Sequence, residues 1–78
     1  MNIETRAYEL LKEQYQKFII ENSEEETTTT LITKMNFIKK LEETARKGNI
    51  ENENDYLQTE KESVLQKLKE KGISYKGN

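Results

Sequence analysis

Apolar residues at helical spacing are the feature that most constrains the fold of this chain. One stripe runs through the middle of the sequence at intervals of four, three, three and four residues. At about 100° per residue, these positions share one face of an α-helix. Basic residues follow, and Gly48 stands where a left-handed residue often ends a helix. We therefore predict a helix that ends at Lys47. The stripe consists of Leu31, Met35, Ile38, Leu41 and Ala45.

The start of this helix is harder to place, because four threonines, Thr27 to Thr30, precede the stripe. Threonine is β-branched and favours strands. However, the segment lacks the alternation of apolar and polar residues typical of a strand, and the sequence offers no second strand to pair with it. Ser23 and Glu26 have the spacing of a capping box. We therefore predict that the helix begins at Glu24 and frays over its first turns.

The first segment of the chain has a wide apolar face and a charged opposite face, which predicts a helix from Ile3 to Glu21. Tyr8 lies at the edge of this face. A face this wide suits a central helix that contacts both of the others. The face consists of Ile3, Ala7, Leu10, Leu11, Tyr15, Phe18 and Ile19.

A third and narrower stripe predicts a helix from Asn54 to Lys71, which contacts one neighbour. Asn52 or Asn54 is placed to cap its start. Gly72 is placed to end it, and Ile73 to make the apolar contact that often accompanies such an end. The stripe consists of Leu57, Val64, Leu65 and Leu68, and Lys61 interrupts it.

Together these segments predict an all-α domain over residues 1–73, with a flexible tail over residues 74–78. The second and third helices would form an αα-hairpin, and the first would pack across it. The chain has 78 residues, of which 32% are hydrophobic and 36% are charged. A chain this small has a thin core, so we expect dimerisation to complete the helical bundle.

The composition argues against catalysis and against a bound cofactor. The chain has no cysteine and no histidine, which removes thiolate ligands and the side chain that titrates nearest neutral pH. Its 15 acidic residues lie outside the apolar runs, so nothing drives the pKa values of two carboxyls apart. We predict that the protein is not an enzyme.

The segment 49–60 has the spacing of a twelve-residue calcium loop, but it departs from that pattern in two ways. Asn54 stands where a glycine makes the sharp turn, and the longer glutamate fills two places where aspartate or asparagine is usual. We therefore prefer to read it as an acidic turn before a helix N-terminus, which the helix dipole favours. The candidate ligands are Asn49, Glu51, Glu53, Asp55 and Glu60.

The function we predict is protein–protein binding, as an adaptor, inhibitor or assembly factor that dimerises through the faces of the first two helices. No apolar run approaches the ~18 residues of a membrane span, and the N-terminus lacks a signal-like apolar core, so we expect a cytoplasmic protein. This composition is common among small accessory proteins of bacteria and phages. The candidate interface residues are Tyr8, Leu11, Tyr15, Phe18, Ile19, Ile20, Leu31, Ile32, Met35, Phe37 and Ile38.

The alternative is a nucleic-acid-binding regulator that uses the lysine-rich ends of the second and third helices. Against it, the connection from Gly48 to Asn54 is longer than the turn of a helix-turn-helix motif. The start of the would-be recognition helix is acidic, and the net charge of the chain is −2. The candidate contacts are Lys39, Lys40, Arg46, Lys47, Lys67, Lys69 and Lys71.

Overall fold

The computed structural model describes residues 3–24 and 26–75, and within them it contains three α-helices, one short 3-10 helix and no strand. This confirms the predicted all-α fold. The α-helices are α1 (Ile3–Glu21), α2 (Thr28–Lys47) and α3 (Asn54–Glu70). The 3-10 helix η1 (Glu51–Glu53) leads into α3.

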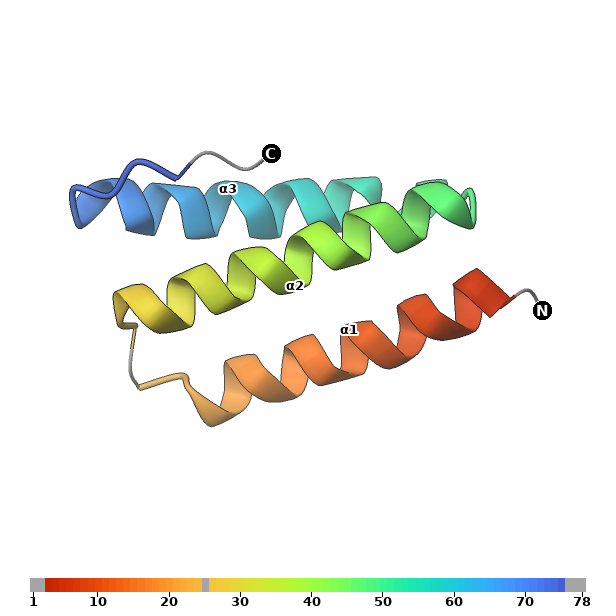
Figure 1. The fold of residues 1–78 in the computed structure, drawn as a ribbon, viewed down its shortest axis with the longest axis horizontal. Coiled ribbons are helices and arrows are strands. Elements are labelled where there is room, and N and C mark those ends of the chain that lie inside the picture. Colours follow the sequence, from red (N-terminus) through yellow and green to blue (C-terminus); the bar gives the residue numbers. More distant parts are fainter. Residues whose placement is uncertain (1–2, 25, 76–78) are drawn as a thin grey trace.

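The central helix is α2, which packs against α1 on one side and α3 on the other (Figure 1). The helices α1 and α3 run parallel to each other and antiparallel to α2. The predicted central position of α1 is therefore wrong. The physical reason is that the apolar stripe of α2 is buried along its whole length, whereas only part of the apolar surface of α1 is.

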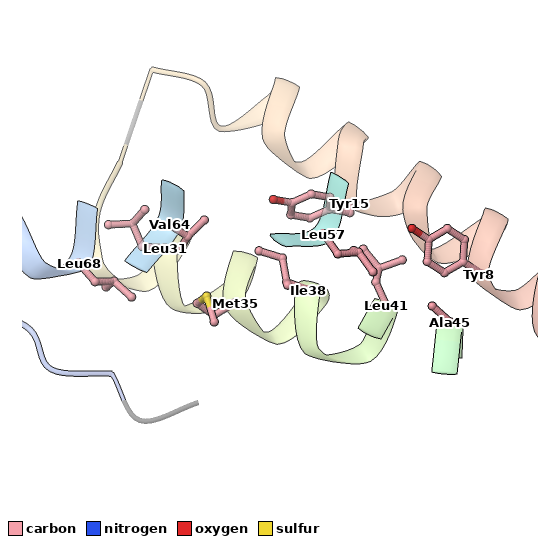
Figure 2. Close-up of a cluster of buried hydrophobic side chains, with 10 residues drawn as sticks. All are labelled: Tyr8, Tyr15, Leu31, Met35, Ile38, Leu41, Ala45, Leu57, Val64 and Leu68. Carbon is pink, nitrogen blue, oxygen red and sulfur yellow. The ribbon is translucent and has the colours of Figure 1, made fainter. Parts of the chain in front are cut away.

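The core forms where the three helices meet (Figure 2). All five residues of the α2 stripe are buried, as predicted, and so are Leu57, Val64 and Leu68 of the α3 stripe. Each large aliphatic side chain contributes roughly 1.5–3 kcal/mol when it is fully removed from water. From α1, Tyr8 and Tyr15 are the buried residues, 3% and 0% exposed.

The buried face of α1 differs from the predicted one. The sequence places Tyr8 at the edge of the apolar face, but the structure places it in the core together with Tyr15. Ile3, Ala7 and Leu10, which were expected in that face, are exposed instead. Tyrosine suits this position because its long side chain buries a ring and still brings its hydroxyl to a polar partner.

The helix α2 begins at Thr28, not at Glu24 as predicted. Thr27 caps it: the backbone N–H of Thr30 donates to the Thr27 hydroxyl oxygen at 3.2 Å, and the Thr30 hydroxyl donates to the Thr27 carbonyl at 2.9 Å. The threonine run thus opens the helix, because the hydroxyl oxygen of threonine serves well at the N-cap. The predicted capping box is not used, since Glu26 bonds to Lys67 instead.

The end of α2 at Lys47 is confirmed, but its left-handed residue is Asn49 (φ 54°) and not Gly48 (φ −92°). The backbone N–H of Ile50 donates to the Ala45 carbonyl at 2.8 Å, which closes a Schellman motif. Gly48 is needed for a different reason. A Cβ atom at Gly48 would lie 2.9 Å from the Cβ of Glu4, so glycine lets α1 approach the end of α2.

The end of α3 follows the prediction within one residue. Gly72 is left-handed (φ 77°), and the backbone N–H of Ile73 donates to the Leu68 carbonyl at 2.9 Å. Ile73 packs against the core, as expected. The expected side-chain cap from Asn52 or Asn54 is absent, because η1 runs directly into the helix.

Part of the predicted C-terminal tail lies on the protein surface. The ring of Tyr75 packs against the core, and the Lys39 ammonium lies 5.5 Å from its centroid. Residues 76–78 of the predicted tail lie outside the described part of the chain.

Candidate interaction surface

Two tyrosines of α1 bridge to acidic residues on the far side of the core. The Tyr8 hydroxyl donates to Glu53 at 2.7 Å, and the Tyr15 hydroxyl donates to Glu60 at 2.6 Å. From the first pair to the second, the tyrosine and its acidic partner each advance by seven residues, because α1 runs parallel to the segment formed by η1 and α3. The backbone of α1 does not approach those of η1 and α3 closely, so these side-chain bonds join the elements.

The environment of these bonds holds the tyrosines neutral. Burial raises the pKa of Tyr8 and Tyr15 well above their usual value, and the acidic acceptors raise it further. Glu53 is held ionised, because the Lys12 ammonium bonds to it at 2.7 Å and lowers its pKa, with Tyr8 as a second donor. At neutral pH these groups serve as fixed structural hydrogen bonds between helices.

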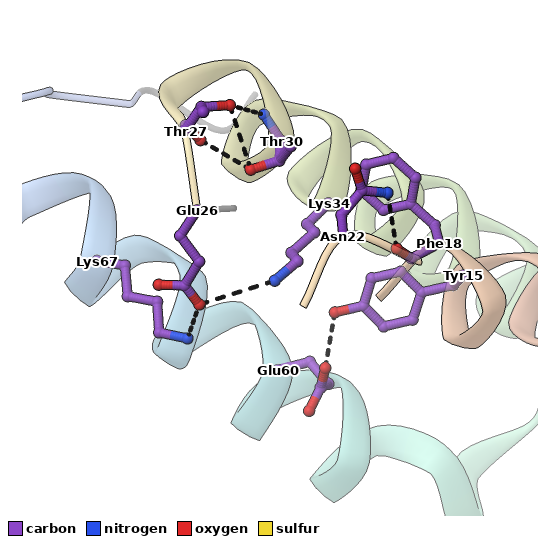
Figure 3. Close-up of polar contacts among 9 residues, drawn as sticks. All are labelled: Tyr15, Phe18, Asn22, Glu26, Thr27, Thr30, Lys34, Glu60 and Lys67. Atoms are coloured by element: carbon purple, nitrogen blue, oxygen red, sulfur yellow. Dashed lines mark hydrogen bonds and ion pairs between the residues drawn. The ribbon is translucent and has the colours of Figure 1, made fainter. Parts of the chain in front are cut away.

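A second polar cluster fastens the α1–α2 connection to α3 (Figure 3). Glu26 accepts a hydrogen bond from Lys67 of α3, which lowers the pKa of the Glu26 carboxyl. Lys34 of α2, only 7% exposed, lies 4.0 Å from the same carboxylate. Two lysines from different helices thus share one acidic residue, which compensates the buried charge of Lys34.

The structure divides the predicted interface residues into three groups. Tyr8, Tyr15, Leu31, Met35 and Ile38 are buried in the core of the single chain, so they do not face a partner. Ile20 is 74% exposed and stands apart from the rest. The remaining residues are half-buried. Leu11, Ile19, Ile32 and Phe37 pack against the core, and the ring of Phe18 lies against that of Phe37.

Two of these half-buried residues on α2, Ile32 and Phe37, do not share one patch. Phe37 faces α1, where its ring centroid lies 5.8 Å from that of Tyr15 and 5.7 Å from that of Phe18. Ile32 and Phe37 are five residues apart, which at about 100° per residue places them on different sides of α2. These residues mainly fill the edges of the core.

A different set of apolar residues is open to solvent along α1. Ile3 is 83% exposed, Leu10 is 44% exposed, and Ala7 between them is also exposed. Their spacing of four and three residues makes one continuous row on the helix. We call Ile3, Ala7 and Leu10 the α1 strip. Sequence reasoning assigned these residues to the core because the row merges with the buried face. The sequence feature that indicates their exposure is the pair Tyr8 and Tyr15. These tyrosines occupy the side of α1 that faces the core, which leaves the strip in solvent.

The basic residues proposed for nucleic-acid contact do not gather in one place. Arg46 and Lys47 lie at the end of α2, and Lys67, Lys69 and Lys71 lie at the opposite end of the bundle, because α2 and α3 are antiparallel. Several of these charges have partners. Lys47 pairs with Glu43 at 3.2 Å, and Lys67 bonds to Glu26. Lys39 lies by the ring of Tyr75, and Lys40 is exposed on α2.

The segment that has calcium-loop spacing folds differently from such a loop. Residues 51–53 form η1, and Asn54 begins α3, so all the candidate ligands except Asn49 lie in helices. Glu53 and Glu60 are already engaged by tyrosines. Within residues 3–24 and 26–75, no three acidic side chains gather where they would hold a metal ion.

Comparisons with protein-family models, with curated proteins and with solved structures find no significant match to this chain. In the part of the chain that the structure describes, no helix is long and apolar enough to cross a membrane.

Proposed function

We propose that this protein is a non-enzymatic module that binds another polypeptide through the α1 strip. The exposure of Ile3 and Leu10 carries the proposal, because with Ile20 they are the exposed large apolar side chains of the described chain. A single exposed apolar residue is ordinary, but a continuous row is typical of a binding face.

The fold explains why the strip stays open. The buried side of α1 is occupied by Tyr8 and Tyr15, which point toward α2 and α3. The strip lies on another side of the same helix. Half-buried Leu11, which packs against the core, and Phe18, whose ring lies against Phe37 of α2, extend the strip toward α2. An amphipathic helix of a partner, laid along α1, would cover this row. Adaptors, inhibitors and assembly factors all use surfaces of this kind.

The nucleic-acid alternative has weaker support. Binding to a duplex requires several cations that reach phosphates along one face. Here the lysines of α3 and the basic end of α2 lie at opposite ends of the bundle, and Lys67 is already bonded to Glu26.

A photo-crosslinking residue at position 10 tests the proposal in the cells that produce the protein. The matched control places the same residue at Asn36, which is exposed on α2. We expect a defined polypeptide adduct from position 10 and none from position 36. The absence of an adduct at position 10, or the same adducts from both positions, would contradict the proposal.

A further inference from the structure

We infer that the helix bound to the α1 strip is α1 of a second copy of this chain, in an antiparallel pair. This inference rests on the proposed function, since it names the partner of the same surface. It also names the surface through which the dimerisation expected from the small size of the chain would take place.

The strip can pair with itself around a two-fold axis near Leu10. In such an interface each contact occurs twice, and residues that precede Leu10 face residues that follow it in the other copy. Leu10 then lies opposite Leu11 of the second copy, and Ile3 lies opposite its Phe18. Leu11 and Phe18 are half-buried in the single chain, so part of each side chain remains available for this contact.

The charges beside the strip favour the antiparallel orientation. Arg6 and Glu13 are both exposed. Arg6 lies four residues before Leu10, and Glu13 lies three residues after it. Antiparallel pairing brings Arg6 of each copy to Glu13 of the other. Parallel pairing in register would instead place the two copies of this flank on opposite sides of the interface, so neither Arg6 nor Glu13 would gain this contact. In the described chain neither residue belongs to an ion pair within 4.0 Å, although both line one shallow hollow along α1.

Charge reversal tests this pairing by sedimentation equilibrium, in a concentration series that extends to millimolar protein. We expect Arg6→Glu alone and Glu13→Arg alone to weaken the dimer about tenfold, since each replaces two attractive contacts with two repulsive ones. The double variant Arg6→Glu/Glu13→Arg exchanges the charges and should recover the wild-type dissociation constant. Lys40→Glu, a change of the same charge on the exposed side of α2, is the control and should leave it unchanged.

A wild-type chain that stays monomeric throughout the series would overturn the inference, as would a double variant no tighter than either single variant. A short bis-maleimide provides a second measurement, because the chain has no native cysteine. Leu10→Cys should cross-link two copies, whereas Ile20→Cys should not.

The failure of this inference is distinguishable from failure of the proposed function. If the photo-adduct at position 10 contains a different polypeptide and the purified chain is monomeric, the self-pairing is wrong and the binding role of the strip stands. If position 10 gives an adduct neither with a second copy of the chain nor with a different polypeptide, the self-pairing and the binding role of the strip are both wrong.

Discussion

The hydroxyl of Tyr15 on α1 donates a 2.6 Å hydrogen bond to the carboxylate of Glu60 on α3, which lies 45 residues further along the chain. Tyr8 makes the equivalent bond to Glu53 at the same sequence separation. These two bonds set the rotation of α1 about its own axis. That rotation turns the tyrosines toward the core and leaves the α1 strip in solvent.

Removal of the Tyr15 hydroxyl should destabilise the fold without loss of the ring. We expect Tyr15→Phe to lower the free energy of unfolding by about 1–2 kcal/mol, because a hydrogen bond to a charged acceptor is lost. Tyr75→Phe is the control, since Tyr75 contacts the core through its ring. This substitution should change stability by less than about 0.5 kcal/mol. Urea unfolding followed by circular dichroism measures both. Equal effects of the two substitutions would contradict the role of the Tyr15 hydroxyl.

Because Tyr8 and Tyr15 are held neutral in the fold, the stability of the protein should fall at alkaline pH. The folded-state pKa of Tyr8 and Tyr15 is raised above the unfolded value of about 10, so the unfolded chain loses its phenolic protons first. Their contribution is therefore fully present below about pH 10 and is lost as the pH rises through the folded values. Thermal melts between pH 8 and pH 11.5 should show a falling melting temperature above pH 10. Tyr15→Phe should make that fall shallower; an unchanged slope would contradict this origin.

The stripe of α2 was predictable from sequence because one helix buried on two sides imposes a strict spacing on its apolar residues. The buried face of α1 was not, because tyrosines and aliphatic residues form one continuous row there. Nothing in the spacing says which part of the row turns inward. The hydrogen bonds to Glu53 and Glu60 determine which part turns inward, and these residues are remote from α1 in the sequence. The start of α2 was also missed, since Ser23 and Thr27 are both acceptable caps and the ion pair of Glu26 with Lys67 settles the choice.

Truncation of the α2 stripe should cost more than truncation of any exposed position. Met35 is fully buried between the helices, so Met35→Ala should lower the free energy of unfolding by about 2–5 kcal/mol through lost burial and a new cavity. The adjacent Asn36 is exposed, and Asn36→Ala should have an effect below about 0.5 kcal/mol. Chemical denaturation of the two variants side by side checks this. A small effect of Met35→Ala would mean that the core is elsewhere.

The close approach of α1 to the end of α2 predicts an energetic coupling between Gly48 and Glu4. Gly48→Ala introduces a Cβ atom 2.9 Å from that of Glu4, and the resulting strain should cost about 1–3 kcal/mol. In the Glu4→Gly background, which removes the opposing Cβ atom, the same substitution should cost less. Gly72→Ala should destabilise through its positive φ, with no dependence on Glu4, because nothing lies within 4 Å of its Cβ position. Additive effects of Gly48→Ala and Glu4→Gly would contradict the contact.

The most direct test of the whole account is carbene footprinting of the dilute, monomeric wild-type chain, read out residue by residue by mass spectrometry. The orientation of α1 predicts strong labelling of Ile3 and Leu10, comparable to that of Ile20, and protection of Tyr8 and Tyr15. Labelling of Tyr15 as strong as that of Ile20, or protection of Ile3 and Leu10 in the monomer, would show that α1 faces the core with its other side and would contradict the account.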